Sequence, residues 1–237
     1  MSDCWIQTRS GLAFDLLEPK PDQVCLADIA WSLGRLSRYT GHGLRHCSVA
    51  EHSVRGADIA ERKYGRATAW DFLMHDAGET YTGDISRPMK LAIRAMYDRY
   101  VKPYLVVPGD PLEMIEALIN ETVGEKYCVV HGRRVKEIDT ADLSVEMLAN
   151  LSTPPPRMWA FDVEALGHKS LSEDPNLWID LHGQLSPIDA TSVWLCKAAE
   201  LAPSDEIREE AIEALTQVSA WDEQAQEGPP DYEIPAP

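Results

Sequence analysis

The chain has 237 residues, of which 44% are hydrophobic and 26% charged, and its formal net charge is −17 at pH 7. This length and composition are typical of a globular protein with one large or two small domains. The acidic excess argues against a nucleic-acid polymer as partner, since phosphate contacts require a basic face. The apolar runs fall short of the roughly 20 residues that a membrane helix needs, and the N-terminal residues lack the pattern of a signal peptide.

The predicted elements are almost all helices, so the expected fold class is an all-α bundle. A short hairpin or extended segment is predicted over 5–17, where β-forming residues flank a Ser-Gly turn. The first helix is expected from Asp28, which would cap it. Ser48 and Glu51 form a capping box that starts the second helix. The helices after the first are predicted over 49–62, 66–80, 90–104, 111–127, 134–151, 186–201 and 204–219.

The last part of the chain is expected to hold a C-terminal helix over 203–219 and an acidic, proline-rich, disordered tail over 220–237. The helices after Ser186 carry apolar faces, which would either join copies into a homo-oligomer or cover the core of the same chain. The five cysteines are widely spaced and include no Cys-x-x-Cys pair. This pattern is typical of free thiols in a reducing compartment, so we expect a cytoplasmic protein. The short apolar runs predict that it has no membrane partner.

Four residues of metal-ligand or acid–base type lie within ten positions: His75, Asp76, Glu79 and Asp84. The apolar segment 70–74 precedes them, which indicates that His75 and Asp76 are largely buried. A buried carboxylate beside an imidazole needs compensation, and a divalent metal ion supplies it. On a continuous helix Glu79 would share a face with His75 and Asp76, and Asp84 would follow where that helix ends.

A metal ion at this position needs further ligands from elsewhere in the chain. His52 lies in the first turn of the helix that Ser48 caps. A late acid is offered by Asp139 or Asp142, between which the spacing does not decide. Two imidazoles and two carboxylates form a mixed nitrogen and oxygen site. Such a site suits one divalent transition metal (Co, Mn, Zn, Fe or Ni) and suits Ca or Mg poorly.

The array of His52, the pair His75-Asp76 and Asp139 resembles the metal-binding set of the HD-domain phosphohydrolases. The likeness extends to the segments VAEHS (49–53), MHDAGETYTGDISRPMK (74–90) and VKEID (135–139). These are similar to a subgroup with bacterial deoxyribonucleoside 5′-monophosphatases and small phage enzymes, some of them dATP triphosphohydrolases. The resemblance covers roughly residues 5–200. It implies an HD-domain helical bundle with its phosphohydrolase core over 1–202, in the cytosol of a bacterium or a phage-infected host.

The resemblance also implies a role for each matching residue. The metal ligands would be His52, His75, Asp76 and Asp139. The catalytic acid–base pair beside the activated water would be Glu79 and Asp84. The substrate-binding residues would be Arg38, Tyr39, Arg87, Pro88 and Lys90. We expect the cations among these, Arg38, Arg87 and Lys90, to cluster, because a chain of charge −17 otherwise repels an anionic substrate.

The implied function is metal-dependent hydrolysis of a deoxynucleotide, a small-molecule partner. The preferred reaction converts a deoxynucleoside 5′-monophosphate to nucleoside and phosphate by attack of a metal-activated water. One alternative is a dNTP triphosphohydrolase that releases triphosphate, which inward-facing Arg45 or Arg94 would favour; a second ion could accompany the substrate phosphates. Another is a non-catalytic metal-binding regulatory protein, against which the acids Glu79 and Asp84 argue.

Overall fold

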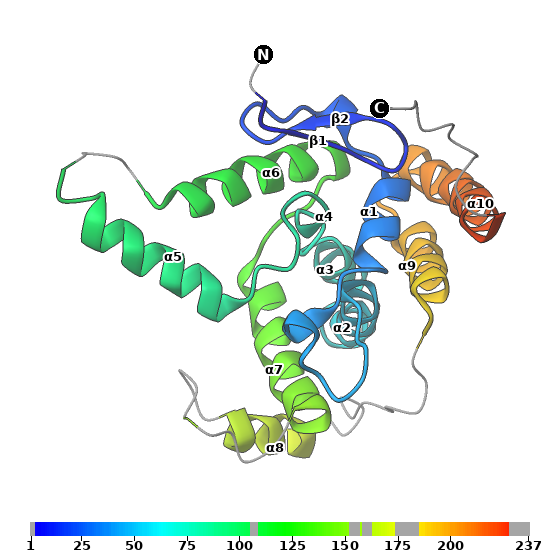
Figure 1. Ribbon diagram of the computed structural model, residues 1–237. Coiled ribbons are helices and arrows are strands. Elements are labelled where there is room, and N and C mark those ends of the chain that lie inside the picture. Colours follow the sequence, from blue (N-terminus) through cyan, green and yellow to red (C-terminus); the bar gives the residue numbers. More distant parts are fainter. Residues whose placement is uncertain (1–2, 105–108, 152–156, 158–162, 174–184, 228–237) are drawn as a thin grey trace.

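The computed structural model describes residues 3–104, 109–151, 157, 163–173 and 185–227. Helices dominate it, and a two-stranded hairpin lies at the N-terminal end (Figure 1). The predicted all-α bundle with a short N-terminal hairpin is therefore confirmed. In chain order the elements are β1 (Trp5–Gln7), β2 (Ala13–Asp15), α1 (Leu26–Leu33), α2 (Val49–Tyr64), α3 (Arg66–Leu73), α4 (Glu79–Thr82), α5 (Arg87–Tyr100), α6 (Pro111–Tyr127), α7 (Arg133–Asn150), α8 (Val163–Glu173), α9 (Pro187–Leu201) and α10 (Asp205–Glu227), with short 3₁₀ turns at Pro21–Gln23 and Arg38–Gly41.

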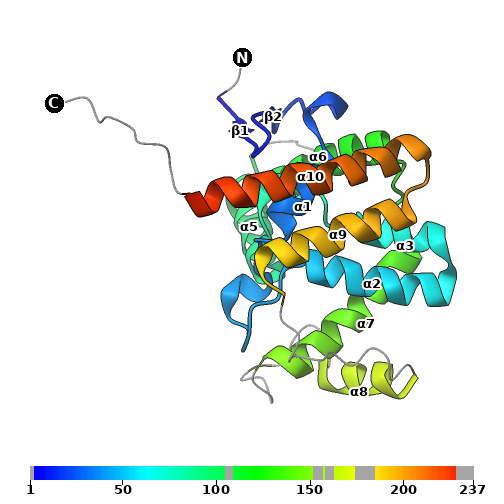
Figure 2. The same cartoon turned by 90° about the vertical axis from the view of Figure 1, so that its right-hand side faces the viewer.

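The core lies where α2 packs against α3, with α9 against α1, α2 and α3. Figure 2 shows α10, α9, α2, α7 and α8 as successive layers. Helix α2 begins at the predicted capping box, in which the Ser48 hydroxyl accepts from the Glu51 N–H at 3.2 Å and Glu51 Oε2 accepts from the Ser48 N–H at 2.9 Å. Its close approach to α3 requires Gly56, because a Cβ there would lie 1.9 Å from the Phe72 ring.

The N-terminal hairpin is attached to the bundle through its own buried residues. Strands β1 and β2 are antiparallel, and the Phe14 ring stacks on Tyr81 of α4 with 3.6 Å between centroids. Asp28 accepts hydrogen bonds from the Ser10 N–H at 2.8 Å and the Ser10 hydroxyl at 2.6 Å. The prediction that Asp28 caps the first helix is wrong. Helix α1 begins at Leu26, whose N–H donates to Glu210 of α10 at 3.0 Å, so a distant side chain supplies the cap.

The helix predicted over 66–80 is interrupted. Helix α3 ends at Leu73, and short i→i−3 hydrogen bonds form the turns that follow before α4. The Phe72 carbonyl, which a continuing helix would use, instead accepts from His75 Nδ1 at 2.6 Å and from the His75 N–H at 3.2 Å. The prediction that His75, Asp76 and Glu79 share one helix face is therefore wrong. His75 and Asp76 lie in the turns that follow α3, and Glu79 begins α4.

The C-terminal helices belong to the core. The apolar faces of α9 and α10 are buried against α1, α2, α3 and each other, so they cover the core of this chain. Helix α10 continues past the expected end at Ser219 to Glu227, because Trp221 is buried edge-on against Trp31 with 5.4 Å between ring centroids. The remainder of the predicted tail, 228–237, lies outside the described residues.

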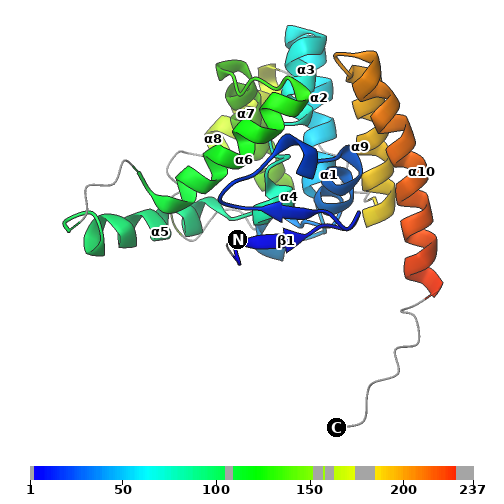
Figure 3. The ribbon, with the colours of Figure 1, turned by 90° about the horizontal axis from the view of Figure 1, so that it is seen from above.

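Helix α5 lies apart from the other layers. Figure 3 shows it extending from one side of the molecule, opposite α9 and α10. It begins at Arg87, three residues before the predicted start, because Pro88 occupies its first turn, where no N–H is needed. Among the described residues, none of the helices has both the length and the apolar character needed to traverse a lipid bilayer.

Replacing Trp221 tests whether the end of α10 stabilises the bundle. Trp221→Ala removes the contact with Trp31 and should lower the free energy of unfolding by about 3 kcal/mol, the cost of a large buried aromatic truncation. The matched control is Ile212→Ala on the same helix, where the side chain is 52% exposed and the change should stay within about 0.5 kcal/mol. Urea unfolding followed by circular dichroism measures both, and equal values would contradict the packing.

Candidate metal centre

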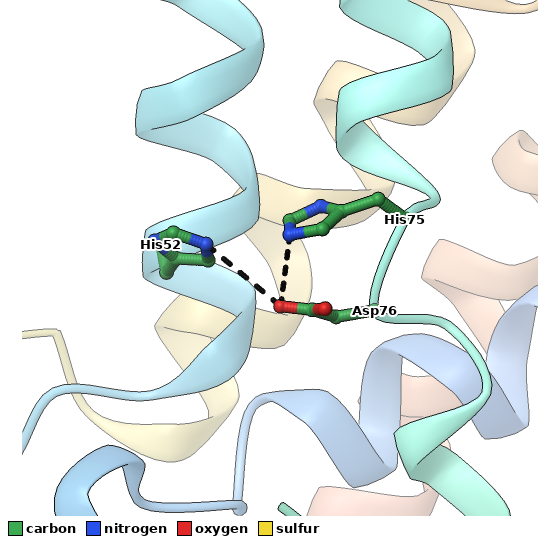
Figure 4. A group of neighbouring side chains, drawn as sticks. All are labelled: His52, His75 and Asp76. Atoms are coloured by element: carbon green, nitrogen blue, oxygen red, sulfur yellow. Dashed lines mark ion pairs between the residues drawn. The ribbon is translucent and has the colours of Figure 1, made fainter. Parts of the chain in front are cut away.

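Two histidines and an aspartate from separate elements point toward one another (Figure 4). His52 comes from α2, while His75 and Asp76 follow the end of α3. Asp76 Oδ2 lies 3.1 Å from His75 Nε2 and 3.8 Å from His52 Nε2. One ligand atom from each residue lies within 4.8 Å of the other two. The close approach of α2 and α3 at Gly56 creates this geometry, since it leaves the two imidazole centroids 5.3 Å apart.

Helix α7 adds Asp139 to this cluster. Its Oδ1 lies 3.6 Å from His52 Nε2, and its Oδ2 accepts from Lys136 Nζ at 2.5 Å. Asp139 thus approaches His52, while the group whose ligand atoms all lie within 4.8 Å of one another consists of His52, His75 and Asp76. We call His52, His75, Asp76 and Asp139 the metal-site cluster.

The unpaired nitrogens of the cluster fit a metal ion. His52 Nε2 and His75 Nε2, like His52 Nδ1, are buried and, in the described part of the chain, have no hydrogen-bond partner of acceptable geometry. The other nitrogen of His75 lies 2.6 Å from the Phe72 carbonyl. That contact requires a proton on Nδ1, so the lone pair of Nε2 faces the cluster, the arrangement that metal-binding histidines commonly adopt. The residues could therefore hold a divalent ion.

A second group could also hold an ion, on the other side of the His52 ring. His52 Nδ1 lies 3.0 Å from Asp142 Oδ2 and 3.4 Å from Glu146 Oε1, and all three side chains are fully buried. The side chains of Arg55 and Arg38 bind these carboxylates. Sequence reasoning considered Asp142 but missed Glu146 and Arg55. The signal was present, because Asp142 and Glu146 share one face of α7 at i and i+4.

The carboxylates of the region have strongly shifted pKa values. Burial raises the pKa of Glu79, and the nearby Asp76 and Asp84 raise it further, to about 9. Burial likewise raises the pKa of Asp84. Asp76 is also buried, but His75, His52 and Arg38 outweigh that effect and hold its pKa below the ordinary value.

His52 gains protons more readily than an ordinary histidine. Burial and the charge of Arg38 lower its pKa, but Glu146 and Asp142 outweigh them and raise it to about 9. A metal ion on Nε2 would therefore compete with a proton there.

A largely apolar pocket of about 370 Å³ adjoins the cluster. The predicted substrate residues Arg38, Tyr39, Arg87 and Pro88 line it together with Asp84, and Leu143, Met147 and Leu151 form its apolar wall. Arg38 Nη1 lies 3.8 Å from Asp76 Oδ2, at the boundary between pocket and cluster.

Lys90 lies beside a different part of the cluster from Arg38. It lines a smaller pocket of about 80 Å³ with His75, Asp76 and Glu79, and its Nζ pairs with Glu116 of α6 at 2.8 Å. Lys90 thus lines a different pocket from Arg38 and Arg87, but it and Arg38 both lie near enough to Glu79 and Asp84 to lower their pKa values, so the expected clustering of the three cations stays a prediction. Because α5 already begins at Arg87, Lys90 lies further along the helix and faces α6. The predicted acid–base pair is divided between the two pockets, with Glu79 in the smaller and Asp84 in the larger.

Comparison with known proteins gives two partial matches. No family model matches the chain. The uncharacterized protein YfdR of Escherichia coli is 36% identical over 86 residues, which cover 36% of this chain and 46% of that protein. The uncharacterized protein RCAP_rcc00048 of Rhodobacter capsulatus is 36% identical over 102 residues, covering 41% of this chain and 52% of that protein. The chain thus spans about half the length of the curated relatives it matches.

Removing a ring from the cluster should abolish metal binding. We expect the metal-free protein to take up one Co²⁺ per chain and His75→Ala to lose this binding, because one lone pair and its orienting contact with Phe72 are gone. Isothermal titration with CoCl₂ measures the stoichiometry and affinity. Asp98→Ala, which removes a half-exposed carboxylate on α5, serves as the control. Unchanged binding by folded His75→Ala would exclude this cluster as the metal site.

Proposed function

We propose that the protein is an HD-domain phosphohydrolase that hydrolyses deoxynucleoside 5′-monophosphates to nucleoside and phosphate in the cytoplasm. The observation that carries this proposal is the joining of the metal-site cluster to the 370 Å³ pocket through the Arg38 guanidinium. A phosphate near the cluster would leave its nucleoside directed into the pocket. The free cysteines of the described residues are in keeping with a reducing compartment.

The walls of the pocket suit the two halves of a nucleotide. Leu143, Met147 and Leu151 offer apolar surface for a base and a deoxyribose. Arg38 provides positive charge beside the cluster and Arg87 provides it in the same pocket, and the planar guanidinium of Arg38 matches the geometry of phosphate oxygens. A local pair of cations offsets the repulsion that a chain of charge −17 exerts on an anion.

Proton transfer is assigned to Glu79 and Asp84. When bound, a divalent transition ion (Co, Mn, Zn, Fe or Ni) supplies an activated water and polarises the phosphoryl group. The pKa of Glu79, raised to about 9, allows this carboxyl to hold a proton near neutral pH and to deliver it to the leaving oxygen, and the pKa of Asp84 is raised in the same direction. Their presence argues against the alternative of a regulatory protein that binds metal without turnover.

The charges near the cluster favour one phosphate over three. The described residues that line the smaller pocket include the acids Asp76, Glu79 and Glu116 and one cation, Lys90, whose Nζ pairs with Glu116. Arg94, one of the residues that could have received extra phosphates, is 56% exposed and pairs with Glu113 at 2.8 Å. Arg45 is exposed and does not line the large pocket. The triphosphohydrolase remains the second candidate, since it would use the same cluster.

The reaction itself is tested by product analysis. Cobalt-loaded protein should release inorganic phosphate from deoxynucleoside monophosphates and no triphosphate from deoxynucleoside triphosphates, and Asp76→Ala should be inactive toward both. Chromatography of the products separates phosphate from triphosphate. Release of triphosphate would establish the alternative reaction, and the absence of either product from metal-loaded protein would refute the proposed function.

Substitution of the pocket arginine tests the substrate pose. Arg38→Lys keeps a positive charge but loses the guanidinium fork, so kcat/KM should fall roughly tenfold to a hundredfold, the value of a charge-assisted hydrogen bond. Arg94→Lys on exposed α5 should leave kcat/KM unchanged. Steady-state kinetics with a deoxynucleoside monophosphate provide the measurement. A similar loss in the two variants would point to a general charge effect and contradict the assigned role of Arg38.

A further inference from the structure

Glu146 contacts residues of both the metal-site cluster and the pocket. Its carboxylate is fully buried in α7 and accepts hydrogen bonds from Arg38 Nε at 3.0 Å and from the Tyr39 hydroxyl at 2.8 Å through Oε2. Its other oxygen, Oε1, accepts from Arg55 Nη2 and lies 3.4 Å from His52 Nδ1. One side chain therefore contacts the imidazole of the cluster and two residues that line the pocket.

Asp142, one turn earlier on α7, contacts only the metal side among the residues that the structure describes. Its Oδ2 lies 3.0 Å from His52 Nδ1, and its two oxygens accept from Arg55 Nε at 2.9 Å and Nη2 at 2.8 Å. Two carboxylates face Nδ1 and favour a proton on that nitrogen, which leaves the Nε2 lone pair toward His75 and Asp76, although neither contact has full hydrogen-bond geometry. The two guanidinium groups that already neutralise Asp142 and Glu146 would repel a cation placed among them.

The pocket side of Glu146 is a strained turn. The backbone φ angles of Tyr39 and Thr40 are 59° and 55°, in the left-handed region that residues other than glycine rarely adopt. The Tyr39 hydroxyl bond to Glu146 fixes the side chain that emerges from this turn. Such strain persists where surrounding contacts over-determine the backbone, and here the contact is the same carboxylate that faces His52.

We propose that Glu146 is a positioning residue that sets two features together: the orientation of His52 toward the metal ion, and the placement of Arg38 and Tyr39 in the substrate pocket. The first of these features, the orientation of His52, is the metal half of the inference and rests on the metal-site cluster alone. The second, the placement of Arg38 and Tyr39, is its substrate half and rests on the proposed function. Asp142 acts together with Glu146 in the metal half, because it also faces His52 Nδ1. The Tyr39 hydroxyl takes part only in the substrate half, through its hydrogen bond to Glu146.

Three substitutions separate the two halves. Asp142→Asn should weaken Co²⁺ affinity about tenfold or more, the usual effect of losing the partner that orients a ligand, and should leave KM at saturating Co²⁺ near the wild-type value. Tyr39→Phe should leave Co²⁺ affinity unchanged and raise KM several-fold. Glu146→Gln should change both quantities. The control Glu137→Gln lies on the exposed side of the same helix, paired with Lys63, and should change neither.

Two measurements of Co²⁺ binding test the metal half of the proposal and do not depend on catalytic activity. Competition between the metal-free protein and a chromophoric chelator gives the Co²⁺ affinity, and the visible absorption of bound Co²⁺ reports its ligand geometry. Because Glu146→Gln leaves Arg38 short of a buried partner, it can destabilise the fold. Glu146→Asp keeps the charge while shortening its reach, and it replaces the glutamine variant if circular dichroism shows that the latter is unfolded.

Folded Glu146 variants with wild-type Co²⁺ affinity, Co²⁺ spectrum and KM would overturn the proposal, as would Tyr39→Phe with unchanged KM. Wild-type protein that binds Co²⁺ but hydrolyses no nucleotide would refute the proposed function and with it the substrate half. The affinities and spectra of the Asp142 and Glu146 variants would then still decide the metal half.

Discussion

A fully buried imidazole, that of His52, joins the two halves of the polar interior. Its Nε2 faces Asp76 and Asp139, and its Nδ1 faces Asp142 and Glu146. Burial of so many charged groups is costly unless each has a partner. Arg55 and Arg38 bind the carboxylates on the Nδ1 side. Among the described residues, neither nitrogen of His52 nor His75 Nε2 has a hydrogen-bond partner. The two Nε2 atoms that face Asp76 are the physical reason for placing a cation among the metal-site cluster.

The backbone around the cluster explains how these groups come together. Gly56 allows α2 and α3 to approach, and the end of α3 at Leu73 turns His75 and Asp76 toward α2. Helix α7 then crosses beside α2 and contributes Asp139 and the buried carboxylates. The N-terminal hairpin and α10 stabilise this arrangement from outside, through the Asp28–Ser10 and Glu210–Leu26 contacts.

Local patterns in the sequence predicted most of this arrangement. The Ser48 capping box located the start of α2 accurately, because this signal acts within one turn, and the helices predicted from 111 and 186 begin at Pro111 and Pro187. The helix break after Leu73 could not be predicted from periodicity, since a side chain of the site itself, His75, occupies the carbonyl that the helix needs. Contacts between residues far apart in the sequence cannot be predicted from local patterns either.

The choice between Asp139 and Asp142 shows that limit most clearly. Both residues lie near His52, but on opposite sides of its ring, and one turn of α7 separates them. Only the packing of α7 on α2 assigns each carboxylate to a nitrogen, and spacing along the sequence carries no such information. Likewise, the pairing of Lys90 with Glu116 depends on how α5 lies against α6, and the two residues are separated by more than a full helix in the sequence.

The most direct test of the account is the position of the ion. Anomalous diffraction at the cobalt edge from crystals of the Co²⁺-loaded protein would locate it independently of any activity. The account predicts one peak within bonding distance of His52 Nε2, His75 Nε2, Asp76 and Asp139. A peak on the Nδ1 side, between Asp142 and Glu146, or the lack of any peak near His52 would contradict it.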